Sequence, residues 1–241
     1  MKWAYLKFIV IGGLVCLIAS LLVFYSYDKE APIVKKELKE NDFMAQRQRA
    51  LENQSKFFSP RSPWVKEIYI VKPGDSLYQI SRLFGITVQL LKQVNDLVSD
   101  TIHPGMKLGI PDPKFHIDIN LSHRQLFLYS NSDLVAAYRV GIGKNISTPL
   151  GAFTITNKLI DPVWYRIGAV IPAGSPENAL GSRWMGLSVE GYGIHGTIEP
   201  ESIGQATSSG CIRMHNKDVE QLFDWFSIGI PVRIVYDEEE P

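Results

Sequence analysis

The chain has 241 residues, with 25 Lys and Arg against 25 Asp and Glu, so its formal net charge is zero. This length allows one substantial core together with a small module, or one large domain. The balanced charge excludes the strong general attraction to nucleic acid or to acidic surfaces that a basic protein has. The partner has to be inferred from local motifs.

A charge-free run over residues 8–27 follows Lys2 and Lys7 and ends at Asp28. As a helix rising about 1.5 Å per residue, such a run spans the hydrocarbon core of a bilayer. Lysines before the run and acids after it favour a cytoplasmic N-terminus, with everything that follows outside the membrane. We therefore expect residues 1–27 to form a cytoplasmic tip and a single-pass transmembrane anchor in the cell membrane.

A cleavable signal peptide is the alternative interpretation of this run. Its end, VFYSYDKE, places aromatic residues where a signal peptidase needs small ones, so the anchor is favoured. Cys16 lies within the run, where it is predicted to be a membrane-buried apolar residue. Cys211 then has no disulfide partner in its own chain on the oxidising side of the membrane, which indicates a functional thiol.

Residues 28–66 are charged and polar and are predicted to be a stalk between membrane and ectodomain. Weak helical periodicity over residues 43–51 leaves open a helix that binds a partner. Pro60 and Pro63 break any helix that reaches them.

Residues 67–112 predict a small α+β module in the order strand, helix, helix, strand (βααβ). Tyr69 and Val71 alternate with their neighbours as in a short strand, and KPGDS is a turn. Ser76 can cap the first helix and Gly85 ends it. An unrelated small adaptor with the same element order is the alternative.

From residue 113 the sequence changes to short alternating runs such as HIDINL, QLFLYS, GAFTITNKLI and IPVRIVY. These predict an antiparallel, mainly-β domain over residues 113–237, followed by an acidic tail at 238–241. The stretch NKDVEQLFDWFS predicts a helix that Asn216 could cap. A stretch rich in Gly, Pro and Ala over residues 164–182 could be a lid over a cleft.

Two polar motifs in this domain, GYGIHGT and SSGCIRMHN, carry His195 and Cys211. Two neighbouring strands could bring these residues together, and an imidazole that withdraws the thiol proton makes a nucleophile. The small residues Ser208 and Gly210 leave room for a substrate carbonyl. The backbone N–H groups of residues 209–211 could form an oxyanion hole. The spacing alone also fits a cysteine and a histidine that are merely structural.

Other side chains near these motifs have several interpretations. Arg213 can point to the same face as the cysteine and hold a carboxylate. Trp184 and Tyr192 are core residues or the wall of a substrate groove. His215 could join a zinc site, but no further ligand with metal-site spacing is present, so no metal and no cofactor are predicted.

The small module closely resembles the LysM module, whose pattern is matched by Tyr69, Val71, GDSL at 74–77, FG at 84–85, Asn95 and GMKLGIP. The LysM resemblance implies binding of N-acetylglucosamine polymers such as peptidoglycan, through the turn after the first strand and the loop after the second helix. In this chain the implied glycan-binding residues are Gly74, Asp75, Ser76, Leu77, Asn95 and Leu97.

The β domain resembles the YkuD type of L,D-transpeptidase, in which a His-Gly pair precedes a Ser-x-Gly-Cys-x-Arg stretch. VGIGKNISTPLGAFTI, GSRWMGL and IPVRIVY extend the match across the domain. The resemblance implies that Cys211 is the nucleophile and that His195 is the general base, oriented by the backbone carbonyl of Gly196. The implied substrate-binding residues are Arg213, Ser208, Ser209, Gly210, Trp184 and Tyr192. Ser209 stands where many members have a second histidine.

Together the two resemblances imply an anchored multi-domain enzyme of cell wall biogenesis. It would cross-link the diamino acids of peptidoglycan stem peptides through a cysteine thioester, with release of D-alanine. An L,D-carboxypeptidase of the same fold and a non-catalytic wall-binding scaffold are the alternatives. The expected partners are peptidoglycan and the membrane, not nucleic acid; protein partners and the acceptor amine cannot be read from the sequence.

Overall fold

The computed structural model describes residues 39–166 and 168–237. Within these ranges no helix is both long enough and apolar enough to cross a membrane. The predicted anchor over residues 8–27, Cys16 and the acidic tail at 238–241 lie outside the described residues. Residues 1–46 and 47–241 form two separate units of the chain.

Residues 39–57 are helical, which extends well beyond the weak periodicity found in the sequence. In the second unit, the side-chain amides of Asn53 and Gln54 each donate to a backbone carbonyl 2.8 Å away, at Leu134 and Val135. Both carbonyls belong to β5 (Asp133–Arg139), which is an edge strand of the large sheet. Polar side chains of a segment predicted to be a stalk therefore satisfy part of an exposed strand edge.

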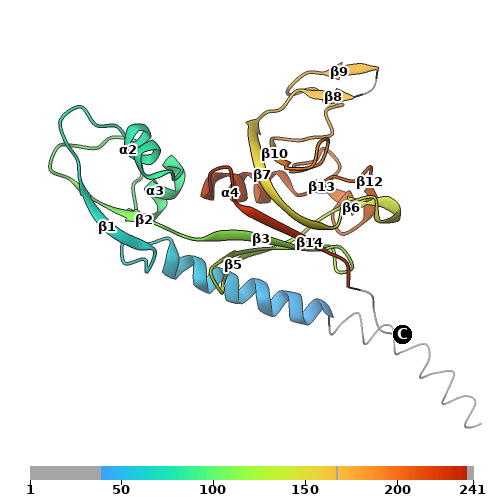
Figure 1. Cartoon of the computed structure of the whole chain (residues 1–241), viewed down its shortest axis with the longest axis horizontal. Helices are drawn as coiled ribbons and strands as arrows, with labels where there is room; N and C mark the ends of the chain where they lie inside the picture. Colours follow the sequence, from blue (N-terminus) through green and yellow to red (C-terminus); the bar gives the residue numbers. More distant parts are fainter. Residues whose placement is uncertain (1–38, 167, 238–241) are drawn as a thin grey trace, which may run out of the picture. The chain divides into compact units, whose positions relative to one another are not determined.

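The small module has the predicted order of elements, strand, helix, helix, strand (Figure 1). These are β1 (Val65–Ile70), α2 (Leu77–Phe84), α3 (Val88–Val94) and β2 (Lys107–Pro111), and β1 pairs antiparallel with β2. Ser76 caps α2 in a capping box with Gln79, and Gly85 ends the helix with a left-handed φ of 67°. Leu77, Ile80, Leu91 and Leu108 form the core between helices and hairpin.

The second domain is built on an eight-stranded sheet in the order β13-β11-β10-β7-β14-β3-β4-β5. Besides β5, its strands are β3 (Phe115–Asn120), β4 (Gln125–Ser130), β7 (Gly151–Ile160), β10 (Arg183–Leu187), β11 (Gly193–His195), β13 (Ile212–Arg213) and β14 (Pro231–Val235). Short two-stranded sheets join β6 (Ile142–Gly143) to β12 (Ala206–Ser208) and β8 (Trp164–Arg166) to β9 (Ala169–Ile171).

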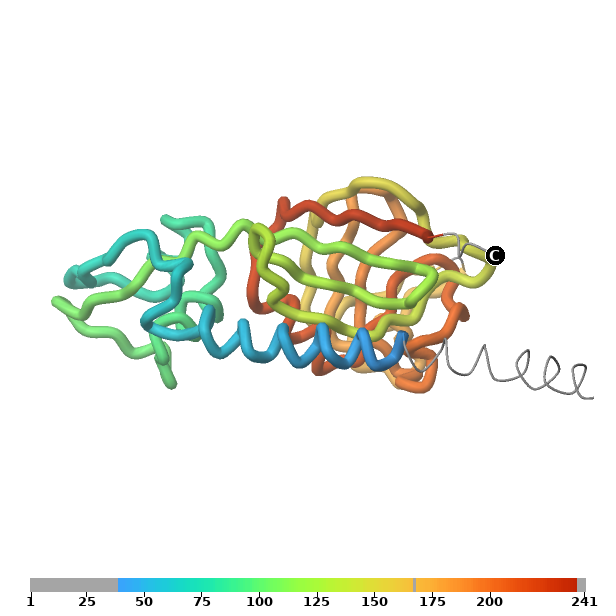
Figure 2. The backbone as a smooth tube through the Cα atoms, turned by 90° about the horizontal axis from the view of Figure 1, so that it is seen from below, coloured from blue at the N-terminus to red at the C-terminus, as the bar shows by residue number. Residues whose placement is uncertain are grey.

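The mainly-β prediction is confirmed, but the expectation of a purely antiparallel sheet is wrong. The last strand, β14, lies between β3 and β7 and runs parallel to β3 (Figure 2). Likewise β11 and β13 are parallel, as are β12 and β6. Parallel pairing joins segments separated by a long crossover, and alternation along a single strand does not reveal its partner.

Helix α4 (Asn216–Trp225) packs against β10 and β11 with Val219, Leu222 and Trp225 buried. Two short 3-10 turns, η1 (Lys144–Ile146) and η2 (Pro200–Ser202), complete the elements. The predicted cap by Asn216 is wrong, because the N-cap residue is His215 and no side chain caps the helix. Asn216 instead bonds backbone groups of other loops.

The small module contacts the β domain through α3 and α4, both within the unit of residues 47–241. The hydroxyl of Thr87 donates to the carbonyl of Asp224 at 2.5 Å. The indole of Trp225 donates to Gln93 at 2.8 Å. Leu90 of α3 also joins the buried core of the β domain. Hydrogen bonds and apolar packing therefore connect the two modules.

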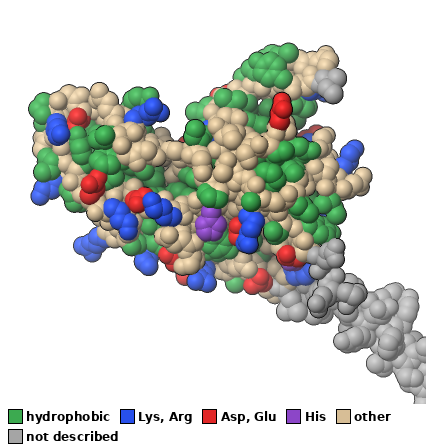
Figure 3. Space-filling model, in the orientation of Figure 1, with side chains coloured by type: hydrophobic (Ala, Val, Ile, Leu, Met, Phe, Trp, Pro, Cys, Tyr) green, Lys and Arg blue, Asp and Glu red, His purple; other side chains and the backbone are tan. Residues whose placement is uncertain are grey.

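The β8–β9 hairpin projects from the end of β7 (Figure 1). Hydrophobic side chains gather on this projection (Figure 3). Tyr165 is 76% exposed and Val170, its partner in the pairing, is 61% exposed. A lid over residues 164–182 stays a prediction.

Candidate active site

The turn between β12 and β13 presents the thiol of Cys211. The buried hydroxyl of Ser208 donates to the carbonyl of Cys211 at 2.7 Å and accepts from the N–H of Gly210 at 3.1 Å. Gly210 has a φ of 136°, and a Cβ added there would lie 2.6 Å from the ring of Tyr192. Only glycine fits both the backbone angle and the space.

These contacts change two expectations for the turn. The Gly210 N–H is used by Ser208, so its predicted place in an oxyanion hole is wrong. Ser208 was predicted to leave room for substrate, but its hydroxyl shapes the turn and it is only 3% exposed. Ser209 is exposed beside Cys211.

Cys211 lies beside the strand that carries His195. The parallel register pairs Ile194 with Ile212, so Cys211, one residue before β13, lies next to Gly193. The N–H of Gly193 hydrogen-bonds the sulfur. The thiol is free, half-buried and donates to the carbonyl of Gly191 at 3.6 Å. The predicted proximity of the two motifs is therefore present at neighbouring strand ends.

His195 is 3% exposed and its Nδ1 lies 2.6 Å from the carbonyl oxygen of Gly196. A carbonyl only accepts hydrogen bonds, so Nδ1 carries the proton and Nε2 keeps its lone pair. The ring of Trp184 stacks on the imidazole with centroids 5.9 Å apart and planes at 21°. This arrangement supports the neutral tautomer that a general base at Nε2 requires.

The electrostatics of the free site favour an uncharged pair. Burial lowers the pKa of His195 to about 4, and the charge of Arg213 lowers it as well, while the carbonyls of Gly196 and Leu180 oppose the change. Burial raises the pKa of the Cys211 thiol against opposing effects of the Gly193 N–H and Arg213. Both shifts favour a thiol and a neutral imidazole in the free site.

Arg213 faces an acidic partner that the sequence analysis did not identify. Its Nη1 lies 2.6 Å from Oε2 of Glu199, with the arginine side chain 15% and the glutamate side chain 53% exposed. The register places Arg213 beside His195, and its backbone also pairs with Gly141. The signal in the sequence was two acidic residues, Glu199 and Glu201, in the loop between the two motifs.

Trp184 and Tyr192 both lie against the two motifs, and their role as the wall of a substrate groove stays a prediction. A Cβ at Gly193 would come within 2.6 Å of the Trp184 ring, so the glycine lets the indole lie across the strand. The indole N–H donates to Asn157 at 3.0 Å, and Tyr192 is half-buried against Gly210. The two aromatic rings thus lie against the two motifs.

The residues predicted to bind glycan are largely used inside the small module. Leu77 is 3% exposed, which leaves its side chain no surface for a sugar. The amide of Asn95 makes three hydrogen bonds, to the carbonyls of Leu91 and Gly109 and from the N–H of Gly109. The carboxylate of Asp75 accepts hydrogen bonds from Tyr69 and Lys72, and Ser76 caps α2. Gly74 is an exposed turn residue, and Leu97 is half-buried.

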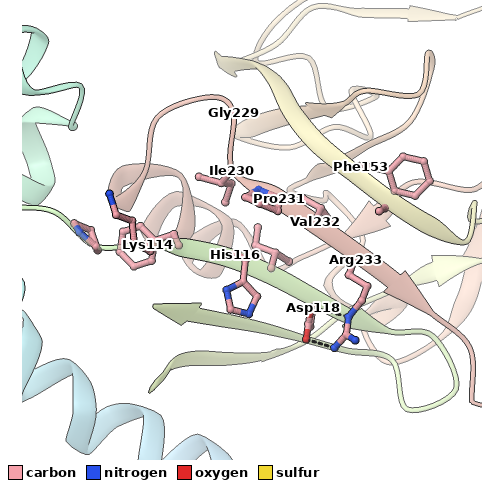
Figure 4. Close-up of a pocket in the computed structure, with 13 residues that line it drawn as sticks. Lys114, His116, Asp118, Phe153, Gly229, Ile230, Pro231, Val232 and Arg233 are labelled. Atoms are coloured by element: carbon pink, nitrogen blue, oxygen red, sulfur yellow. Dashed lines mark hydrogen bonds and ion pairs between the residues drawn. The ribbon is translucent and has the colours of Figure 1, made fainter. Parts of the chain in front are cut away.

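A hollow of about 800 Å³ lies away from the thiol, on β3, β7 and β14 (Figure 4). It is lined by Lys114, His116, Phe153 and the Asp118–Arg233 ion pair, and by neither Cys211 nor His195. Among residues 39–166 and 168–237, no group of three or more His, Cys, Asp or Glu could hold a metal ion.

Comparison with known proteins shows the family to which this chain belongs. The model of the YkuD L,D-transpeptidase catalytic domain matches residues 114–234, and the model of the LysM domain matches residues 69–111. The chain belongs to the YkuD family of L,D-transpeptidases and carries a LysM domain. The family and the module predicted from the sequence are thereby confirmed, while the anchor stays a prediction.

Two curated relatives illustrate the similarity. The protein named as L,D-transpeptidase YkuD of Bacillus subtilis is 38% identical over 161 residues, which cover 64% of this chain and 90% of that protein. The protein named as L,D-transpeptidase YcfS of Escherichia coli is 30% identical over 190 residues, 67% of this chain and 59% of that protein. A solved L,D-transpeptidase from Mycobacterium smegmatis aligns with a TM-score of 0.44 and 22% identity, over 54% of this chain and 63% of that one.

Proposed function

We propose that the protein is a peptidoglycan L,D-transpeptidase that cross-links stem peptides through a thioester on Cys211. One observation carries the proposal. The free thiol of Cys211 lies beside the strand that ends in His195, whose Nδ1–H is held by the Gly196 carbonyl. A thiol next to an imidazole with an available Nε2 lone pair is the arrangement of an acyl-transfer nucleophile.

In the first step the thiol turns from the Gly191 carbonyl toward the imidazole. The sulfur of Cys211 attacks the carbonyl that joins the L-centre of a diamino acid to a terminal D-alanine, and Nε2 of His195 accepts the thiol proton. The C–N bond then breaks, the proton passes to the leaving amine, and D-alanine departs. A thioester between Cys211 and the stem remains.

In the second step the side-chain amine of another stem attacks the thioester. Its proton passes to Nε2 of His195, the C–S bond breaks, and the thiolate takes the proton back. The product is an amide between two diamino acids, and the site returns to its neutral state. The lowered pKa of His195 and the raised pKa of Cys211 support a cycle that begins and ends with both groups uncharged.

Arg213 would position a substrate carboxylate in this reaction. Because its guanidinium is paired with Glu199 in the free protein, a carboxylate has to replace Glu199 or join the pair. Glu199 is more than half exposed, so solvent can accept it when it is displaced. Trp184 and Tyr192 would border the bound stem.

We further propose that the enzyme acts at the outer face of the cell membrane on the wall polymer. The charge pattern of residues 1–28 supports an anchor, and the LysM domain supports binding to the glycan strands to which stem peptides are attached. Attachment to the same polymer raises the local concentration of stems at the thiol.

The test is mass spectrometry of the full chain in detergent, incubated with a disaccharide tetrapeptide, beside a Cys211→Ala variant. We expect loss of D-alanine together with dimer formation only in the unmodified protein. Loss of D-alanine without a dimer would instead make the protein an L,D-carboxypeptidase. No change in either sample, with glycan binding intact, would support the scaffold interpretation.

A further inference from the structure

One peptide unit next to His195 is bonded on both sides. Its carbonyl, from Gly196, accepts the hydrogen bond of His195 Nδ1 at 2.6 Å. Its N–H, from Thr197, donates to Oδ1 of Asn216 at 3.0 Å. Because a peptide unit is planar, the bond on the N–H side fixes the direction in which the carbonyl points.

Asn216 holds this segment through both the oxygen and the nitrogen of its side-chain amide. Its Nδ2 donates to the carbonyl of Thr197 at 3.0 Å, and its Oδ1 also accepts from the N–H of Ser182 at 3.3 Å. Thr197 is thereby bonded through both its N–H and its C=O, as if to a neighbouring strand. The loop after the histidine therefore cannot rotate without breaking bonds to the first residue of α4.

Two glycines make room for this amide. A Cβ at Gly196 would lie 2.1 Å from Oδ1 of Asn216, and a Cβ at Gly181 would lie 2.3 Å from the same atom. Asn216 is the first residue of α4, one position after the N-cap residue His215. Its amide makes no capping bond to the helix and bonds the loop instead.

We infer that Asn216 is a positioning residue that orients the Gly196 carbonyl and, through it, fixes His195 in the Nδ1–H tautomer. The hydrogen bond to Oδ1 also polarises the peptide, which makes the Gly196 carbonyl a stronger acceptor for the imidazole. Asn216 acts through the peptide and touches neither thiol nor substrate. Its effect on turnover rests on the proposed function, whereas its effect on the imidazole does not.

The direct readout is the ¹⁵N and ¹H NMR spectrum of the His195 ring in the full chain at neutral pH, without substrate. In the unmodified protein we expect one protonated nitrogen, Nδ1, and one unprotonated nitrogen, Nε2. In Asn216→Ala we expect both nitrogens to move toward averaged shifts, because the carbonyl is released and the tautomers mix. A spectrum with unchanged ring nitrogens in this variant would overturn the inference.

Two further variants separate positioning from folding. Asn53→Ala removes an amide hydrogen bond to Leu134 on β5, at the opposite edge of the sheet, and should leave the imidazole spectrum unchanged. Asn216→Asp keeps an acceptor for Thr197 and strengthens it, so the Nδ1–H proton should shift downfield while the tautomer is retained. If Asn216→Ala does not fold, an Nδ1–H shift in Asn216→Asp equal to that of the unmodified protein overturns the inference.

Kinetics with the disaccharide tetrapeptide provide the second readout. For Asn216→Ala we expect kcat to fall roughly 10- to 100-fold with KM within about threefold, because misorientation of a base slows chemistry more than binding. Partial recovery of kcat is expected in Asn216→Asp. Absence of turnover in the unmodified protein would contradict the proposed function and leave the NMR result to decide the role of Asn216.

Discussion

Replacing His195 with glutamine should make the protein more resistant to acid. In the folded state burial lowers the pKa of His195 from 6.5 to about 4. Between these values the unfolded chain binds a proton at this position and the folded protein does not, so acid favours unfolding. Lowering one pKa across this range corresponds to roughly 3 kcal/mol of lost stability at pH 4. Above pH 6.5 the histidine contributes no pH dependence.

The assay is urea unfolding of the unmodified protein and His195→Gln at several values between pH 7 and pH 4. The difference between their free energies of unfolding should move in favour of the variant as the pH falls, by up to about 3 kcal/mol. His103→Gln, which changes an exposed histidine of the small module, should follow the unmodified protein. A difference between His195→Gln and the unmodified protein that stays constant with pH would refute the reasoning.

Three other predictions follow from the site and its support. Alkylation of Cys211 by iodoacetamide should have its pH midpoint above that of an ordinary thiol, because burial raises its pKa; a midpoint at or below the ordinary value would contradict this. Gly210→Ala should lower the free energy of unfolding in urea by about 1–3 kcal/mol and abolish turnover. The control is Gly204→Ala, where φ is 81° and no atom crowds the new methyl group, so the loss of stability should be about 1 kcal/mol or less. Equal losses of stability in the two variants would contradict the steric argument. Lys158→Met should lower the free energy of unfolding by about 1–3 kcal/mol, because two backbone carbonyls at the end of α4 lose their hydrogen-bond donor. Lys217→Met, which changes an exposed lysine of α4, serves as the control.

The motifs around the thiol could be read from the sequence because their residue types are demanded locally. Small residues precede Cys211, and His195 is followed by a glycine whose carbonyl lies within reach of Nδ1. The motifs therefore singled out the two residues, and the resemblance to the YkuD family implied the roles of nucleophile and base. The βααβ module was accessible for the same reason, because caps, turn glycines and apolar spacing act over a few residues.

Other features depend on segments that are far apart in sequence. The pairing of Arg213 with Glu199 places an anion on the residue expected to bind substrate, and no local pattern distinguishes that glutamate from a solvated one. Burial of Leu77 likewise removes a predicted glycan contact, because position 77 begins the apolar face of a helix as well as ending a turn. Sequence motifs identify which side chains could bind or react, but they do not show which of these side chains the fold buries or pairs.

The sequence by itself determined the two modules and the two motifs that carry Cys211 and His195, because local stereochemistry and residue type are properties of short segments. Tertiary structure decided the parallel insertion of β14, the neutral state of the thiol and imidazole, and the link from Asn216 to the peptide behind His195. These depend on burial and on strand order, which arise only when distant segments share one core.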